Sequence, residues 1–190
     1  MIDESVIENK VREIKKELRL AMNGVVSTIQ RNHGLNYKIN FGVEVPRLKG
    51  IAGKFDKEKG LAERLWQDNI RECKMLAIFL MPESGYTDVA EKWIEETPFT
   101  EIADHLTMVI LSNLPNAATK AIGWIQNSNG MFRYCGFMTL THLFRKGVEL
   151  DKEQESIYLA TAKGIEENDS RKTVIMAAYN SLGHYCDEEE

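Results

Sequence analysis

The sequence has few cysteines and no long apolar run. Cys73, Cys135 and Cys186 are odd in number, lie far apart and form no CxxC pair. We therefore expect reduced thiols, as in a cytoplasmic protein, and neither disulfides nor cysteine metal ligands. No apolar run approaches the roughly 20 residues needed to span a bilayer, and the charged start MIDESVIENK lacks the apolar segment of a signal peptide. We expect no membrane association.

Two further absences concern metals and cofactors. The four histidines show no HxxxH or HxH spacing, so the sequence does not suggest a zinc site. No glycine-rich loop follows a predicted strand, so a nucleotide cofactor is not indicated either. We expect neither a metal nor a cofactor.

The chain also lacks the basic excess that is typical of nucleic-acid binders. Its formal net charge is −5 at pH 7, which argues against DNA as a partner. However, the last four residues, Asp187 to Glu190, supply four of the negative charges, so the remainder of the chain stands near −1. A net charge near −1 is compatible with a local groove lined by Lys and Arg.

Only four prolines interrupt a chain whose apolar pattern is helical nearly throughout. The opening helix is predicted over residues 7–25, where apolar side chains recur in steps of four and three. Its opposite side carries four cations, which are more typical of a solvated face than of phosphate binding: Arg12, Lys15, Lys16 and Arg19. No segment shows a sustained alternation of apolar and polar residues that is also rich in β-branched side chains, so we expect little or no sheet.

Four later segments resemble one another. They start at Arg71, Glu101, Arg133 and Arg171, which lie 30, 32 and 38 residues apart. This interval fits helix pairs stacked into a solenoid better than four long bundle helices. At 190 residues the chain is long enough for one sizeable core. We therefore predict an all-α solenoid in a single domain, with an N-terminal helix and linker over 1–40, repeats over 41–185 and an acidic tail over 186–190.

One of these segments, PFTEIADHLTMVIL over residues 98–111, contains an unusual carboxylate. Asp104 points away from the main apolar stripe of the predicted helix, and its own face carries Thr100 and Met108. From helix geometry alone, a partly exposed carboxylate with a local hydrogen bond is favoured over a catalytic group.

The stretch from Phe41 to Leu80, which contains FGVEVPRLKGIAGKF and LAERLWQDNIRECKMLAIFLM, resembles the DNA alkylation repair family of AlkD-like HEAT-repeat DNA glycosylases. The segments from Trp93 to Asp104 and WIQNSNGMFRYCGFMTL from Trp124 extend the resemblance. It implies a HEAT-like curl of helix pairs whose concave face holds double-stranded DNA, and excision of N3- and N7-alkylated purines.

The resemblance also implies a site. Asp104 matches the family's catalytic Asp, which would stabilise the developing oxocarbenium sugar and orient water. Arg133 lies in the segment whose arginines contact phosphate, although a carboxylate such as Glu101 or Asp104 is an equal candidate for its partner. The glycosylase hypothesis predicts a basic stripe of Arg133, Lys74 and Arg171 with Asp104 exposed at its centre.

The sequence departs from the family pattern near this site. Thr100 stands where the family has an aromatic residue, Tyr134 replaces the second arginine of a pair, and no Trp occurs near Met176 and Tyr179. Tyr134 is our candidate for a substitute aromatic. Two alternatives stay open: a non-catalytic HEAT-like scaffold that binds a protein partner, with Asp104 in a salt bridge, and a binder of altered DNA that excises no base.

The remaining conspicuous side chains are expected to be structural. Arg71 and Glu72 are predicted to tie neighbouring repeats together instead of binding a ligand. Trp66, Trp93 and Trp124 lie in amphipathic patterns, so we expect them in the core and not on a base-stacking surface.

Overall fold

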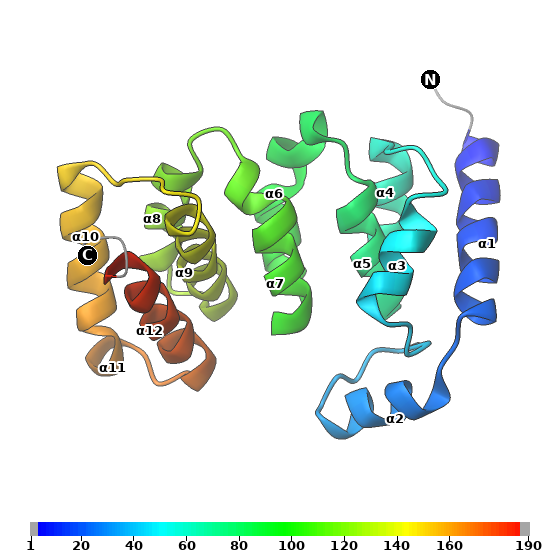
Figure 1. Ribbon diagram of the computed structural model, residues 1–190, viewed down its shortest axis with the longest axis horizontal. Coiled ribbons are helices and arrows are strands. Elements are labelled where there is room, and N and C mark those ends of the chain that lie inside the picture. The colour runs from blue at the N-terminus through cyan, green and yellow to red at the C-terminus, as the bar shows by residue number, and fades with distance from the viewer. Residues whose placement is uncertain (1–3, 187–190) are drawn as a thin grey trace. The chain divides into compact units, whose positions relative to one another are not determined.

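The computed structural model describes residues 4–186, except for the side chain of Cys186 (Figure 1). The predicted acidic tail therefore lies outside the described residues from Asp187 onwards. Contacts between Cα atoms divide the chain into two compact units, Met1–Gly85 and Tyr86–Glu190. The single domain suggested by the sequence stays a prediction.

The first unit is built from five α-helices and a short 3-10 turn within its described residues. They are α1 (Glu4–Leu20), α2 (Gly24–Asn32), α3 (Val45–Ala52), α4 (Lys59–Trp66), α5 (Arg71–Leu80) and η1 (Glu83–Gly85). Helix α5 packs against α4 and α3, and α4 also contacts α1. Nearly all of α5 is buried, so it forms the centre of this unit's core.

The predicted opening helix is two helices. Helix α1 ends at Leu20, and Asn23 caps α2 by accepting hydrogen bonds from the backbone N–H groups of Val25 and Val26. Asparagine is a strong N-cap residue because its side chain satisfies N–H groups that have no partner within the helix. Val25 continues the apolar period in sequence but is 71% exposed, so periodicity alone placed the boundary wrongly.

Arg71 and Glu72 form the tie that the sequence suggested. Glu72 is fully buried and accepts hydrogen bonds from the backbone N–H groups of Phe41 and Val43. Arg71 donates to the carbonyl oxygen of Val43 and also contacts Glu72. These contacts fix the segment before α3 onto the first turn of α5, which confirms a structural role for the pair.

The second unit contains seven α-helices and one 3-10 turn within its described residues. They are α6 (Tyr86–Glu95), α7 (Thr100–Val109), η2 (Leu111–Asn113), α8 (Ala117–Ile125), α9 (Gly130–Phe144), α10 (Lys152–Lys163), α11 (Ile165–Asn168) and α12 (Lys172–Cys186). Helix α9 packs against α6, α7, α8 and α12, so it is the central helix of the unit.

Close approach of α8 to α9 depends on Gly136. A Cβ atom at this position would lie 2.8 Å from the backbone N of Ile125 and 3.0 Å from the carbonyl oxygen of Ala121. Such contacts are shorter than side chains tolerate against a rigid backbone, so glycine is required where the two helices touch.

The described residues confirm the predicted all-α class. Their only β pairing is one isolated parallel bridge between Ile39 and Ile70. Trp66, Trp93 and Trp124 are at most 5% exposed, which confirms that they belong to the core. Within residues 4–186, no helix combines the length and the apolar character needed to cross a membrane.

Candidate functional site

A pocket of about 510 Å³ opens on the surface that α7, α9 and α12 form together. Helix α7 supplies Thr100 and Asp104, and α9 supplies Tyr134 and Met138. Helix α12 supplies the remaining lining residues: Lys172, Thr173, Met176, Ala177 and Asn180. Because α9 packs against both α7 and α12, three of the four similar segments found in the sequence lie next to one another and build this pocket.

Asp104 is half-buried in this pocket, where its partner is the phenol of Tyr134. The hydroxyl of Tyr134 donates a hydrogen bond of 2.6 Å to Oδ1 of Asp104. Among the described residues, Oδ2 has no hydrogen-bond partner and no Lys or Arg forms an ion pair with Asp104. Asp104 therefore does not form the salt bridge that the hypothesis of a protein-binding scaffold predicted.

The surroundings of Asp104 raise its pKa above the ordinary value for aspartate. Burial is the largest cause, and the charge of Glu101 adds to it, whereas the hydrogen bond from Tyr134 and the charge of His105 lower the pKa. Burial also raises the pKa of Tyr134, and the hydrogen bond to Asp104 raises it further. The phenol therefore stays protonated and remains a donor.

Of the residues on the α12 side of the pocket, the sequence had drawn attention only to Met176, near the place where an expected Trp is missing. Lys172, Met176 and Asn180 are all exposed and follow one another at intervals of four residues, so they lie along one face of the helix. Arg171, which was predicted to contact DNA, lies immediately before this face. The spacing was visible, but only the packing of α12 beside α9 shows that this face meets Asp104.

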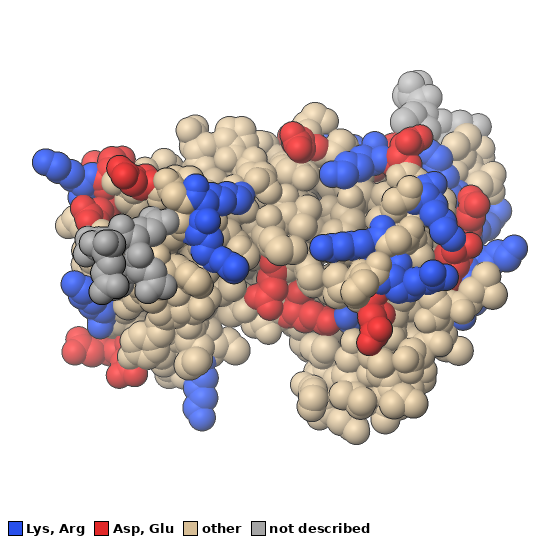
Figure 2. Space-filling view, in the orientation of Figure 1, with Lys and Arg blue, Asp and Glu red and all other residues tan. Residues whose placement is uncertain are grey.

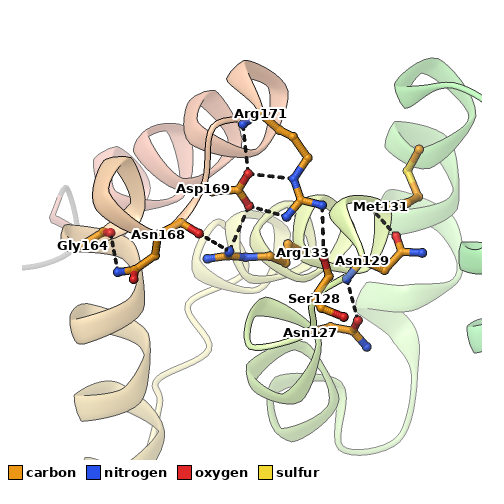
Figure 3. A network of polar contacts seen from close by, with 9 residues as sticks. All are labelled: Asn127, Ser128, Asn129, Met131, Arg133, Gly164, Asn168, Asp169 and Arg171. Atoms are coloured by element: carbon orange, nitrogen blue, oxygen red, sulfur yellow. Dashed lines mark hydrogen bonds and ion pairs between the residues drawn. The ribbon is translucent and has the colours of Figure 1, made fainter.

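Arg133 and Arg171 share one buried carboxylate (Figure 3). Nη1 of Arg133 lies 2.9 Å from Oδ2 of Asp169 and donates to the carbonyl oxygen of Asn168. Arg171 donates to Asp169 through Nε at 2.7 Å, through Nη2 at 2.6 Å and through its backbone N–H. Arg133 is therefore paired with a carboxylate, which was one of the two open alternatives, but this carboxylate is Asp169 and neither Glu101 nor Asp104.

These contacts govern the charge state of Asp169. The hydrogen bond from Arg171 is the main cause that lowers the pKa of Asp169, to about 2, and the charge of Arg133 acts in the same direction. Arg133 is only 8% exposed. The arrangement ties α9 to the segment between α11 and α12, and the arginines hold it in place.

Lys74 belongs to the first unit and is buried. Its Nζ donates a 2.9 Å hydrogen bond to the carbonyl oxygen of Trp66 and lies 4.3 Å from the centroid of the Trp66 ring. Lys74, Arg133 and Arg171 therefore all have structural partners. Their predicted contact with DNA stays a prediction, and none of the three lines the pocket of Asp104.

The net charge of the whole chain conceals an uneven distribution. Residues 4–85 contain 15 Lys and Arg against 11 Asp and Glu, whereas residues 86–186 contain nine Lys and Arg against 13 Asp and Glu. Figure 2 shows Lys and Arg side chains gathered over α1 and α3 of the first unit. Lys54 forms an ion pair of 2.6 Å with Glu17, and the charges of Arg47 and Lys16 also lower the pKa of this carboxylate. A basic surface therefore exists on a chain that is acidic in total.

Some of the cations on α1 have partners. Lys15 forms an ion pair with Asp68 at 2.9 Å, and Arg12 donates to Asn9. Arg12, Lys16 and Arg19 are exposed, as expected for a solvated face, whereas Lys15 is half-buried beside Asp68. Within residues 4–186, no group of three or more His, Cys, Asp or Glu side chains is arranged to hold a metal ion.

Comparison with known proteins gives one family and one solved structure. The family described as DNA alkylation repair enzyme matches residues 14–178. No curated protein matches the chain. The solved structure has a TM-score of 0.73 and 20% sequence identity, and the match covers 91% of this chain and 74% of the other. It represents "a new family of proteins related to the HEAT-like repeat DNA glycosylases with affinity for branched DNA structures". This likeness confirms the predicted HEAT-like helical-repeat fold.

Proposed function

Because the chain belongs to the DNA alkylation repair enzyme family, we propose that it binds DNA and excises N3- or N7-alkylated purines at the pocket of Asp104. One observation carries the proposal: a half-buried carboxylate lies in a pocket of about 510 Å³, with a neutral phenol as its hydrogen-bond partner. A carboxylate in this setting attracts a developing positive charge more strongly than one exposed to bulk water.

The excision reaction develops a positive charge that the carboxylate of Asp104 can stabilise. Alkylation at N3 or N7 gives the purine a positive charge, so the base leaves readily. When the C1′–N bond breaks, its electron pair neutralises the purine and the positive charge passes to the sugar. Asp104 stabilises this oxocarbenium, water then adds at C1′, and the proton released from that water passes to solvent. Asp104 acts as an electrostatic partner, and the proposal needs neither a metal nor a protein acid for the leaving base.

The other lining residues suit a nucleotide. Met138 and Met176 offer polarisable apolar surface for a sugar or base. Lys172 is exposed at the same pocket and supplies a cation for a neighbouring phosphate. The pocket thus combines one anion for the sugar with one cation for the backbone.

The first unit contributes to DNA binding through its basic surface. Most of the affinity of proteins for DNA comes from neutralising phosphates, and this term is independent of sequence. The exposed cations Arg47 and Lys49 on α3 are suited to that role. DNA binding by this chain is then expected to depend on where its Lys and Arg side chains lie and not on the net charge of the whole chain.

Release of 7-methylguanine from methylated duplex DNA tests the proposed excision. Wild type should release the base, and Asp104→Asn, which keeps the shape but removes the charge, should release it at least 100-fold more slowly. Glu95→Gln is the matched control, since Glu95 is an exposed carboxylate at the end of α6 that does not line the pocket. Equal rates for wild type and Asp104→Asn would refute the role of Asp104.

A second candidate function is the binding of altered DNA without excision. Two observations favour it: Thr100 lines the pocket at the position where the family has an aromatic residue, and the protein of the matched structure has affinity for branched DNA. This function predicts tighter binding of a four-way junction than of a linear duplex at equal salt, with no base release. Excision by wild type would eliminate it as the sole function.

A further inference from the structure

The contact between Tyr134 and Asp104 joins two residues that lie 30 positions apart in the sequence. We propose that Tyr134 is a positioning residue that binds Oδ1 of Asp104, keeps the carboxylate ionised and leaves Oδ2 as the oxygen that faces the developing cation. The inference rests on the proposed excision reaction. It gives Tyr134 on α9 a role in orienting the catalytic carboxylate, which differs from contacting a phosphate or packing against a sugar.

The geometry of the contact supports this role. The hydrogen bond measures 2.6 Å, within the range of strong O–H to carboxylate bonds. Both side chains are half-buried and line the same pocket. Residues from α7 and α9 are held relative to one another because these helices pack together. The phenol therefore fixes one of the two carboxylate oxygens and restricts rotation of the carboxylate group.

The chemical identity of the partner also matters. A guanidinium or ammonium beside Asp104 would share its negative charge and compete with a cationic sugar for it. A phenol donates a hydrogen bond without adding a positive charge, so the carboxylate retains its net charge of −1 for the substrate. Tyr134 thus orders Asp104 at little electrostatic cost to the reaction.

Charged and titratable groups around Asp104 come from three helices. On α7 they are Glu101 and His105, on α9 Tyr134 and the buried thiol of Cys135, and on α12 Lys172 at the pocket wall. Burial raises the pKa of Asp104, and the Tyr134 hydrogen bond is the largest cause that opposes this rise. Removing the phenol hydroxyl should therefore raise the pKa of Asp104 further.

The experiment measures the pKa of Asp104 directly, by following its carboxyl carbon with NMR over a pH titration. In Tyr134→Phe, which keeps the ring and removes the hydroxyl, we expect the pKa to rise by roughly 1 to 2 pH units, the equivalent of a hydrogen bond to a charged group. Replacing Tyr134 by 3,5-difluorotyrosine, a stronger donor of similar size, should move the pKa in the opposite direction. An unchanged pKa in both variants would overturn the proposal.

A kinetic measurement separates this inference from the proposed function. If excision occurs, its rate should fall on the acid side as Asp104 becomes protonated, and Tyr134→Phe should move this limb to higher pH by the same amount as the NMR pKa. A structural loss alone would lower the rate at every pH and leave the limb in place, which would contradict the positioning role. If no excision occurs while the NMR pKa still shifts, the proposed reaction fails and the control of Asp104 by Tyr134 stands.

Discussion

Replacing Asp169 by Asn should destabilise the second unit strongly, because one buried carboxylate serves two arginines. The side chain of Asp169 is 1% exposed, that of Arg133 9% and that of Arg171 41%. An asparagine keeps the shape but removes the charge. The guanidinium of Arg133 cannot release its proton and would be left buried without a counter-charge.

The size of this loss follows from the pKa of Asp169 and from the burial of Arg133. The arginines lower the pKa of Asp169 from 3.8 to about 2, which corresponds to at most about 2.5 kcal/mol of stability at neutral pH. Loss of one partner from a buried pair typically costs about 3 to 5 kcal/mol. We expect about 2 to 3 kcal/mol for Asp169→Asn, because the partly exposed Arg171 can regain hydration. Arg171→Gln, which leaves Arg133 paired, should cost about 1 kcal/mol or less.

Urea unfolding at two pH values measures this loss. A carboxylate whose pKa is lowered by folding contributes stability that is present above its ordinary pKa and disappears as the pH falls through the folded value. The difference in unfolding free energy between wild type and Asp169→Asn should therefore have its largest value at pH 7. It should decrease as the pH falls from about 4 to about 2. A difference below 1 kcal/mol at pH 7, or one that stays constant down to pH 2, would refute the reasoning.

Three further substitutions test other parts of the structure. Gly136→Ala should lower the unfolding free energy by about 1 to 3 kcal/mol, because its Cβ would meet the backbone of α8; Gly123→Ala, where a Cβ meets nothing within 4 Å, should leave stability unchanged or raise it by up to about 1 kcal/mol. Lys74→Met should lower stability by about 1 to 2 kcal/mol in urea unfolding, since the carbonyl oxygen of Trp66 loses its donor. Arg47→Glu should weaken DNA binding and reduce the slope of log K against log salt by about 1, whereas Lys152→Glu on the acidic second unit should change neither.

The helical periodicity predicted the fold well, because burial of one face against a neighbouring helix dictates where apolar residues recur. It also predicted the four similar helices and the burial of the tryptophans. It failed at residues 21–25, where α1 has ended at Leu20 and Asn23 caps the start of α2 although the apolar period continues. Local capping chemistry overrode the pattern there.

The site was less accessible to sequence reasoning, since its contacts join distant segments. Asp104 emerged from the family resemblance, but its hydrogen bond to Tyr134 depends on how α7 packs on α9. In the same way, Asp169 lies 36 residues after Arg133, and no periodicity connects them. Lys172 was missed because its role follows from the placement of α12 beside the pocket.

The most direct test of the account is a single-turnover measurement on a duplex that carries one 7-methylguanine. With enzyme in excess, the rate of base release is compared with spontaneous depurination of the same duplex. The account predicts that wild type accelerates release and that Asp104→Asn returns the rate to within a few-fold of the spontaneous value, with duplex affinity retained. Release at the spontaneous rate by wild type, on a duplex shown to be bound, would contradict it.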